Sequence, residues 1–130
     1  MQEKAKKKTK TEVMKKDELI VFAKAKALAS YVVRVSARAA VKYRYSLVTP
    51  LIYRSHEAIS LLYEANVLEL SDPKRKDLIR QAIGKVELVS YLGLFCAEVG
   101  ALSKKRGENI ALLAAECLKY CFGYLAICKS

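Results

Sequence analysis

Glycine and proline, the residues that most often interrupt a helix, are scarce here: the 130 residues include five glycines and two prolines. The long stretches between them are rich in alanine, leucine, glutamate and lysine, which have high helix propensities. The chain is 53% hydrophobic, which is enough to build a core in one domain of this length. The sequence therefore predicts an all-α protein.

Capping residues and breaks in the apolar pattern divide the chain into four predicted helices. Their expected ranges are 17–36, 49–70, 72–99 and 103–128. Short connections favour antiparallel neighbours, so we expect an up-down-up-down four-helix bundle over residues 17–130. Residues 1–16 carry seven lysines against two glutamates and are expected to form a disordered basic arm.

The start of each later helix is predicted from its capping residues. Asp72, which a proline follows, is the expected N-cap of the third helix, and Ser103 that of the fourth, with Asn109 after Gly107 as the alternative start. Gly100 is expected to end the third helix. For the second helix Thr49 is the expected N-cap, with Ser46 one turn earlier as the alternative.

The first predicted helix is apolar on more than one side, with a single basic stripe. Its apolar residues are Leu19, Ile20, Val21, Phe22, Leu28, Tyr31, Val32, Val33 and Val35. A helix with so wide an apolar surface needs burial on two faces. We therefore expect this helix to contact another subunit as well as the core of its own bundle.

The charge of the chain is strongly positive, and the excess is not confined to the N-terminal arm. The formal net charge is +11, and residues 17–130 alone hold 17 basic and 11 acidic side chains. A basic surface attracts polyanions, chiefly nucleic acid or an anionic membrane. The alternative is that the charge serves solubility alone.

The candidate contact residues are cations on the first helix, at the junction after it, and on the second and third helices. They are Lys26, Arg34, Arg38, Lys42, Arg44, Arg54, Lys74, Arg75, Lys76 and Arg80. We expect them to contact phosphate or an acidic protein surface, although a solvated helix face is the alternative for each. Three cations at the start of the third helix are unfavourable beside its positive dipole end, which favours an anionic partner there, although Asp72 and Asp77 offset the penalty.

The segment VKYRYSLVTPLIYR, residues 41–54, combines tyrosines with cations and so suggests either a nucleic-acid contact or a helix junction. Its proline places it between the first and second helices. Tyrosine rings can be buried while their hydroxyl groups stay in water. We therefore expect Tyr43 and Tyr45 to pack against the bundle, and Lys42 and Arg44 to face a polyanion.

Catalytic and cofactor-binding motifs are absent from the sequence. It contains no GxxxxGK[ST], GxGxxG or HExxH motif and no acidic cluster suited to two metals. His56, the single histidine, has no acidic or nucleophilic partner at a suitable spacing and is expected on the surface. We therefore expect a protein that is not an enzyme and needs no cofactor.

All four cysteines lie in apolar helical patterns. They are Cys96, Cys117, Cys121 and Cys128. We expect them to be buried and reduced, as in a cytoplasmic protein. Cys117 and Cys121 share a helix face, but no further ligand completes a metal site, so we predict none.

Residues 110–128 are apolar enough to suggest a membrane helix. Glu116 and Lys119 lie near the middle of this stretch, where each charge would cost about 2.5–3.5 kcal/mol to insert. They are spaced i, i+3 and can pair on one face. Burial in a bundle or oligomer explains the pattern without this cost, so we expect no membrane contact.

From Lys42 onward the chain resembles a known family in several segments. These are Lys42-Tyr43-Arg44-Tyr45, AISLLYEAN (58–66) and KRKDLIRQAIGKVELVSYLGLFCAEVGALS (74–103). In the final helix Glu116, Gly123 and Tyr124 match, whereas Lys119 stands for an arginine and Phe122 for a glycine. The family is Avd, the accessory variability determinants, which are small basic four-helix proteins that accompany diversity-generating retroelements.

The resemblance implies a non-catalytic accessory protein. Avd proteins form a ring-like, positively charged homopentamer that binds the reverse transcriptase and the template RNA, and they support adenine-directed mutagenic cDNA synthesis (mutagenic retrohoming). Related four-helix proteins are encoded in insertions of bacterial 23S ribosomal RNA genes. They lead to the alternative of a structural or interaction module that has no retroelement role. DNA as the bound nucleic acid also remains open.

Overall fold

A computed structural model describes the backbone of residues 2–69 and 71–128 and the side chains of residues 18–69 and 71–128. Within these ranges the chain forms four long helices and no strand. They are α1 (Gln2–Ser36), α2 (Thr49–Val67), α3 (Pro73–Glu98) and α4 (Lys104–Ile127). A 3-10 turn, η1 (Val41–Tyr43), and a π-helical turn, η2 (Arg44–Val48), join α1 to α2. The predicted all-α class is confirmed.

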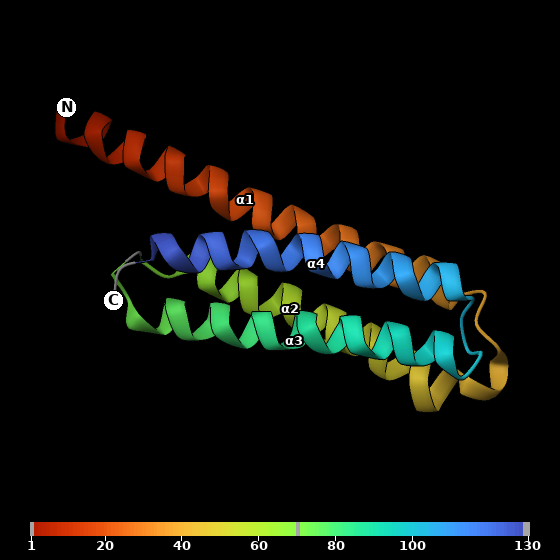
Figure 1. Cartoon of the computed structure of the whole chain (residues 1–130). Coiled ribbons are helices and arrows are strands. Elements are labelled where there is room, and N and C mark those ends of the chain that lie inside the picture. The colour runs from red at the N-terminus through yellow and green to blue at the C-terminus, as the bar shows by residue number, and fades with distance from the viewer. Residues whose placement is uncertain (1, 70, 129–130) are drawn as a thin grey trace.

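The helices run up, down, up and down, and together they form one four-helix bundle (Figure 1). Helix α1 packs against α2 and α4, and α3 packs against the same two helices. The α1–α2 and α3–α4 connections therefore lie at one end of the bundle, whereas the α2–α3 connection lies at the other (Figure 1). This arrangement places segments from both halves of the sequence side by side.

Helix α1 begins at Gln2 and so includes residues 2–16, for which the sequence predicts a disordered arm. Its first turns project past the ends of the other helices (Figure 1). The side chains of residues 1–17 lie outside the described residues, and the disorder of the arm stays a prediction.

Two predicted N-caps are confirmed and one is wrong. Asp72 Oδ1 accepts a 3.0 Å hydrogen bond from Lys74 N, and Ser103 Oγ accepts a 3.2 Å bond from Arg106 N. Thr49 does not cap α2, because η2 runs directly into this helix and leaves no free helix start. The Thr49 hydroxyl instead donates a 2.8 Å hydrogen bond to the carbonyl oxygen of Arg44.

Helix α3 ends as predicted, and it then packs closely on α4. Gly100, just after α3, has a φ of 85°, a conformation that side chains other than glycine rarely adopt. Where the two helices meet, a Cβ on Gly107 would lie 2.5 Å from Ala97 Cβ and 2.8 Å from Gly93 O. Glycine is therefore required at position 107 for this close packing.

The core is filled by branched and small apolar side chains from all four helices. Its fully buried members include Val32, Leu51, Leu62, Ile79, Val86 and Ile110. All four cysteines are also buried, as predicted. The core therefore accounts for the apolar residues on the inward face of each helix, but not for those on the outward faces.

By length and composition alone, helix α4 could span a membrane, although a core helix can share these properties. In the bundle its inward face contributes to the core, and 28% of the residues in its most apolar stretch are buried. The pair between Glu116 and Lys119 that their spacing allows is not formed. Glu116 instead accepts a 2.9 Å hydrogen bond from Lys24 Nζ, which ties α4 to α1.

Candidate nucleic-acid interface

The ten predicted contact residues do not form one surface. Four lie at the end where α1 joins α2, namely Arg34, Arg38, Lys42 and Arg44. Three lie in the first turns of α3, at the opposite end, namely Lys74, Lys76 and Arg80. The remaining three are Lys26 midway along α1, Arg54 near the start of α2, and Arg75.

The prediction for Arg75 is wrong, because its guanidinium is buried inside the bundle. The residue is 2% exposed. Its Nε donates a 2.8 Å hydrogen bond to Tyr124 Oη, and its Nη2 donates to the Glu18 carboxylate. Arg75 precedes the buried Ile79 by four residues and so belongs to the inward face of α3. That spacing was the signal in the sequence that would have excluded it.

Arg75 belongs to a polar network that sequence analysis missed. Tyr124 Oη, which accepts from Arg75, donates a 2.8 Å hydrogen bond to Asn66 Oδ1. Burial raises the pKa of Tyr124 to about 12, although the neighbouring Arg75 opposes this shift. Glu18, Asn66, Arg75 and Tyr124 come from α1, α2, α3 and α4 in turn, so each helix contributes one residue. The network is therefore a structural tie, and Arg75 is unavailable to a phosphate.

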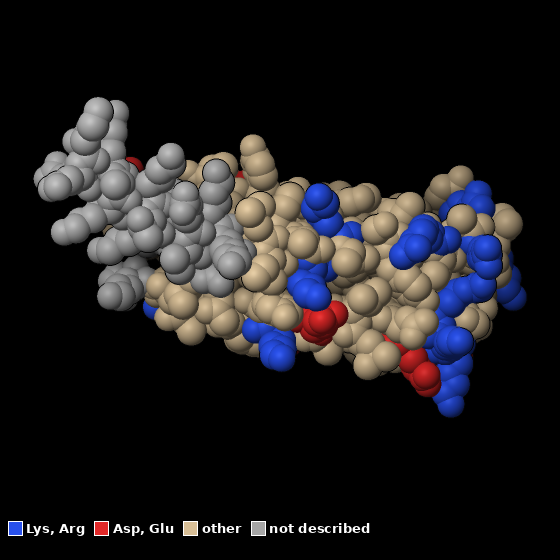
Figure 2. Space-filling view, turned by 90° about the horizontal axis from the view of Figure 1, so that it is seen from above, with Lys and Arg blue, Asp and Glu red and all other residues tan. Residues whose placement is uncertain are grey.

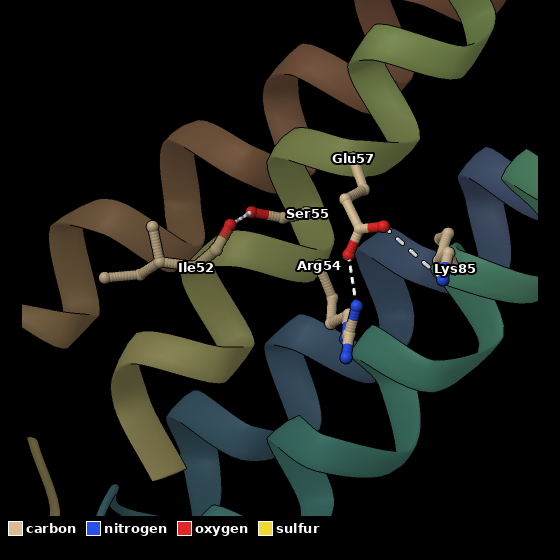
Figure 3. Close-up of polar contacts among 5 residues, drawn as sticks. All are labelled: Ile52, Arg54, Ser55, Glu57 and Lys85. Carbon is tan, nitrogen blue, oxygen red and sulfur yellow. Dashed lines mark hydrogen bonds and ion pairs between the residues drawn. The ribbon is translucent and has the colours of Figure 1, made fainter. Parts of the chain in front are cut away.

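Arg54 is also less available than the sequence suggests (Figure 3). Its Nη1 donates to Glu57 Oε1, while Lys85 Nζ of α3 lies 3.4 Å from Glu57 Oε2. The hydrogen bond from Arg54 lowers the pKa of the Glu57 carboxyl, although desolvation opposes the shift. Arg54 is thus half-buried and already paired with Glu57.

The end of the bundle that holds the α1–α2 and α3–α4 connections gathers most of the unpaired cations (Figures 1 and 2). We call this surface the basic end, and it consists of Arg34, Arg38, Lys42, Arg44, Lys104, Lys105 and Arg106. Within the described part of the chain, none of these seven is in an ion pair. The acidic residues on the adjoining turns of α3 and α4 are Glu98 and Glu108, which line a shallow depression beside Lys104.

Contacts between α1 and α4 hold the basic end together. Asn109 Nδ2 on α4 donates a 3.0 Å hydrogen bond to Tyr31 Oη on α1. The guanidinium carbon of Arg34 lies 5.8 Å from the centroid of the Tyr31 ring. The first turn of α4 is therefore fixed beside the last turns of α1. Sequence analysis missed Lys104, Lys105 and Arg106, although their run of three cations after the Ser103 cap was a visible signal.

The two tyrosines of the α1–α2 junction behave differently. Tyr43 is half-buried and packs against the core, which confirms its prediction, and Lys42 Nζ lies 5.0 Å from its ring centroid. The prediction for Tyr45 is wrong, because its side chain is 85% exposed. Within η2 the inward positions belong to Leu47 and Val48, which leaves Tyr45 facing solvent.

His56 and the cysteines, the residues with potential chemical reactivity, lie in different surroundings. His56 is exposed, as predicted. The hydrogen bond with Cys121, together with burial, raises the pKa of the Cys117 thiol. Among the described residues, no group of three potential metal ligands converges. The site is therefore defined by charge and exposed rings.

Helices α1 and α4 also expose apolar side chains. Those of α1 are Leu19, Ile20 and Val33, and those of α4 are Leu112, Phe122 and Ile127. The Lys24–Glu116 pair and the Tyr31–Asn109 bond show that α1 and α4 lie side by side in antiparallel directions. Leu19 and Phe122 are therefore at a similar level of the bundle. This uncovered apolar surface matches the expectation that α1 has more than one apolar face.

The described residues define a basic, all-helical bundle with a cationic end. Comparisons of the chain with protein-family models, with curated proteins and with solved structures found no match. The resemblance to the Avd family accordingly stays a prediction and enters the functional argument as a hypothesis.

Proposed function

We propose that this chain is a non-catalytic accessory protein of a diversity-generating retroelement. In this proposal it binds reverse transcriptase and template RNA through basic surfaces and supports mutagenic cDNA synthesis. The observation that carries the proposal is the basic end, where seven cations gather without an ion-pair partner in the described part of the chain. Cations that bind the phosphates of a nucleic acid displace the counterions condensed on it, and this release favours a nucleic-acid ligand. The resemblance alone supplies the reverse transcriptase as partner.

The proposal includes assembly into a homo-oligomer, with the pentamer of the Avd family as the expected form. The support is the exposed apolar surface of α1 and α4, which a partner subunit would remove from water. A cytoplasmic location is part of the same proposal. The inward face of α4 and the Lys24–Glu116 pair support packing of α4 within the bundle rather than in a membrane.

One measurement separates this function from the alternatives. The full chain is purified with and without nuclease, and its mass by light scattering is compared with its absorbance ratio at 260 and 280 nm. Because the chain has eight tyrosines and no tryptophan, bound nucleic acid would dominate the spectrum. We expect an oligomer that carries nucleic acid until nuclease removes it. A clean monomer contradicts the proposal and favours the structural module of the ribosomal-insertion type, while a requirement for detergent favours a membrane protein.

The retroelement role has its own test. The gene should lie beside a reverse transcriptase gene flanked by template and variable repeats. Coexpression with that enzyme and its template RNA should then allow mutagenic cDNA synthesis, and omission of this chain should abolish it. A chain that binds RNA but leaves cDNA synthesis unchanged would restrict the function to RNA binding.

A further inference from the structure

We propose that the outward face of η2 and α2 is a stacking platform for single-stranded nucleic acid. The platform, which we call the tyrosine stripe, consists of Tyr45, Tyr53 and Tyr63, with unpaired bases on the rings and phosphates on neighbouring cations. This inference rests on the proposed nucleic-acid binding and specifies its form, because it requires bases that are not already paired.

The three rings lie along one side of a nearly continuous helix. Because η2 runs directly into α2, the exposed residues Tyr45, Thr49, Tyr53 and Ser60 recur at spacings that keep them on the outward face. Tyr63, one turn after Ser60, lies at the edge of this face toward α1. Tyr45 is 85% exposed, and Tyr53 and Tyr63 are each 60% exposed. At about 1.5 Å per residue the stripe is about 27 Å long, which matches about eight stacked nucleotides at 3.4 Å each.

A cation accompanies each tyrosine of the stripe. Arg44 directly precedes Tyr45 at the basic end. The guanidinium carbon of Arg54 lies 5.5 Å from the centroid of the Tyr53 ring. A ring that is stacked on one side by a cation can still receive a base on its other side. Arg54 is also paired with Glu57, so Arg44 is the cation of these two that meets the adjoining phosphate.

Tyr63 obtains its cation through a second ring on α1. Its ring centroid lies 6.4 Å from that of Phe22, and Lys26 Nζ lies 5.5 Å from the Phe22 centroid. This cluster joins the far end of the stripe to Lys26, a predicted contact residue that the basic end does not include. The stripe therefore links predicted cations that otherwise lie apart on the bundle.

Glu57 and Glu64, the acidic residues of α2, lie on the side of this helix that faces α3. Glu57 pairs with Lys85 of α3. Glu64 lines a depression of about 500 Å³ with Lys74 and Asp77, also toward α3. Tyr63 packs toward α1 through Phe22, whereas Tyr53 lines a depression with Glu57 and with Gln81 and Lys85 of α3. Glu57, the carboxylate beside Tyr53, is already paired with Arg54 and Lys85, which weakens its repulsion of a polyanion laid along the stripe.

A single strand fits this surface better than a second copy of the chain. Two copies joined through the stripe would bring Arg44, Arg54 and Lys26 against like charges. The exposed apolar side chains of α1 and α4, such as Leu19, Leu112 and Phe122, are the better candidates for a contact between copies. A duplex is also a poorer ligand, because its bases are already stacked on one another. Stacking on tyrosine tolerates any base, so RNA and DNA strands both satisfy the proposal.

The test compares a fluorescent 12-nucleotide single strand with a 12-base-pair duplex, by anisotropy with the full chain. The variant is Y45L/Y53L/Y63L, which keeps apolar bulk but removes the rings. We expect its single-strand affinity to fall by about 100-fold or more, since each stacked base contributes about tenfold. Duplex affinity and the salt dependence should stay within about twofold, because phosphate contacts are retained.

Two control variants sharpen the result. Y45F/Y53F/Y63F keeps the rings and should bind like the wild type. Y91L removes a ring that is 66% exposed on α3, away from the stripe, and should also leave binding unchanged. A four-nucleotide strand is expected to bind more weakly than the 12-nucleotide strand, since it cannot reach from Tyr45 to Tyr63.

The failures of the two proposals are distinguishable. If the wild type binds neither strand nor duplex, the proposed nucleic-acid function is wrong. If it binds both, and the leucine variant keeps its single-strand affinity, the stacking platform is wrong while the proposed function stands. If the leucine variant changes its mass by light scattering and loses duplex binding as well, the stripe is a subunit contact, and the inference is again overturned.

Discussion

Arg75 Nε donates a 2.8 Å hydrogen bond to Tyr124 Oη inside the bundle, and this contact joins the first turn of α3 to the last turn of α4. The tyrosine hydroxyl in turn donates a hydrogen bond to Asn66 Oδ1 on α2, and the guanidinium donates a hydrogen bond to the Glu18 carboxylate on α1. Four helices thus meet at one chain of hydrogen bonds. Buried polar groups that satisfy one another in this way stabilise a single arrangement of helices, because each loses its partner if the helices shift.

Replacing Tyr124 with phenylalanine should destabilise the bundle by about 1–3 kcal/mol. The substitution keeps the ring but leaves Arg75 Nε and Asn66 Oδ1 without their buried partner. Chemical denaturation followed by circular dichroism measures the change. Tyr91→Phe, on the exposed side of α3, is the matched control and should change stability by less than about 0.5 kcal/mol. Equal stabilities for the two variants would show that the network contributes nothing.

The ionisation of Tyr124 should make the fold sensitive to alkaline pH. Its pKa is raised by burial to about 12 from an ordinary value near 10, so the folded state holds this proton more tightly than the unfolded state. The contribution to stability is complete below pH 10 and is lost as the pH rises toward 12. Phenolate absorbance should show one tyrosine titrating later than the others. This late step should disappear in Tyr124→Phe, and its persistence there would assign it to another residue.

The pairing of Glu18 with Arg75 predicts that substitutions at the two positions have non-additive effects on the free energy of unfolding. Arg75→Met should cost about 3–5 kcal/mol, because it leaves a largely buried carboxylate without its partner. The double variant Glu18→Gln with Arg75→Met should recover part of this loss, since no charge is then stranded. Denaturant midpoints for the two singles and the double give the coupling energy. Arg80→Met, an exposed cation one turn later, is the control and should be nearly neutral.

The ends of α3 and the start of α4 were predictable from the sequence because the signals for them are local, whereas α1 begins at Gln2 rather than near residue 17. Asp72 and Ser103 cap α3 and α4 as expected, and Gly100 ends α3 in a left-handed conformation. The prediction that Thr49 caps α2 is wrong because the π-helical turn before it removes the free helix start that a cap requires. Helix ends that follow another helical turn are therefore harder to predict than ends that follow a loop.

The candidate site was predicted only in part because it depends on contacts between distant segments. Arg34 and Lys104 are far apart in sequence, and the antiparallel packing of α1 on α4 brings their turns together. Arg75 was misplaced because a cation in a basic run was interpreted by its neighbours rather than by its position on the inward face. Tyr45 was misplaced because a half-apolar ring fits either a core or a solvent-facing contact.

The close approach of α3 and α4 predicts opposite effects for two glycine-to-alanine changes. Gly107→Ala should destabilise the bundle by about 1–3 kcal/mol, since its Cβ would lie 2.5 Å from Ala97 Cβ and 2.8 Å from the backbone of Gly93. Gly84→Ala meets nothing within 4 Å and should stabilise α3 by up to about 1 kcal/mol through helix propensity. Thermal denaturation of both variants measures the difference. Two effects of the same sign would contradict the packing described for Gly107.

Neutralising the three cations in the first turn of α4 should weaken nucleic-acid binding and make the affinity less dependent on salt concentration. The variant K104Q/K105Q/R106Q removes three cations of the basic end. For a single strand each phosphate contact contributes about 0.7 to the slope of log affinity against log salt, so the slope should fall by about 2. The matched control, K74Q/K76Q/R80Q, removes three cations at the opposite end and should leave the slope nearly unchanged. Equal losses for the two variants would mean that binding follows net charge, and that the basic end has no special part in it.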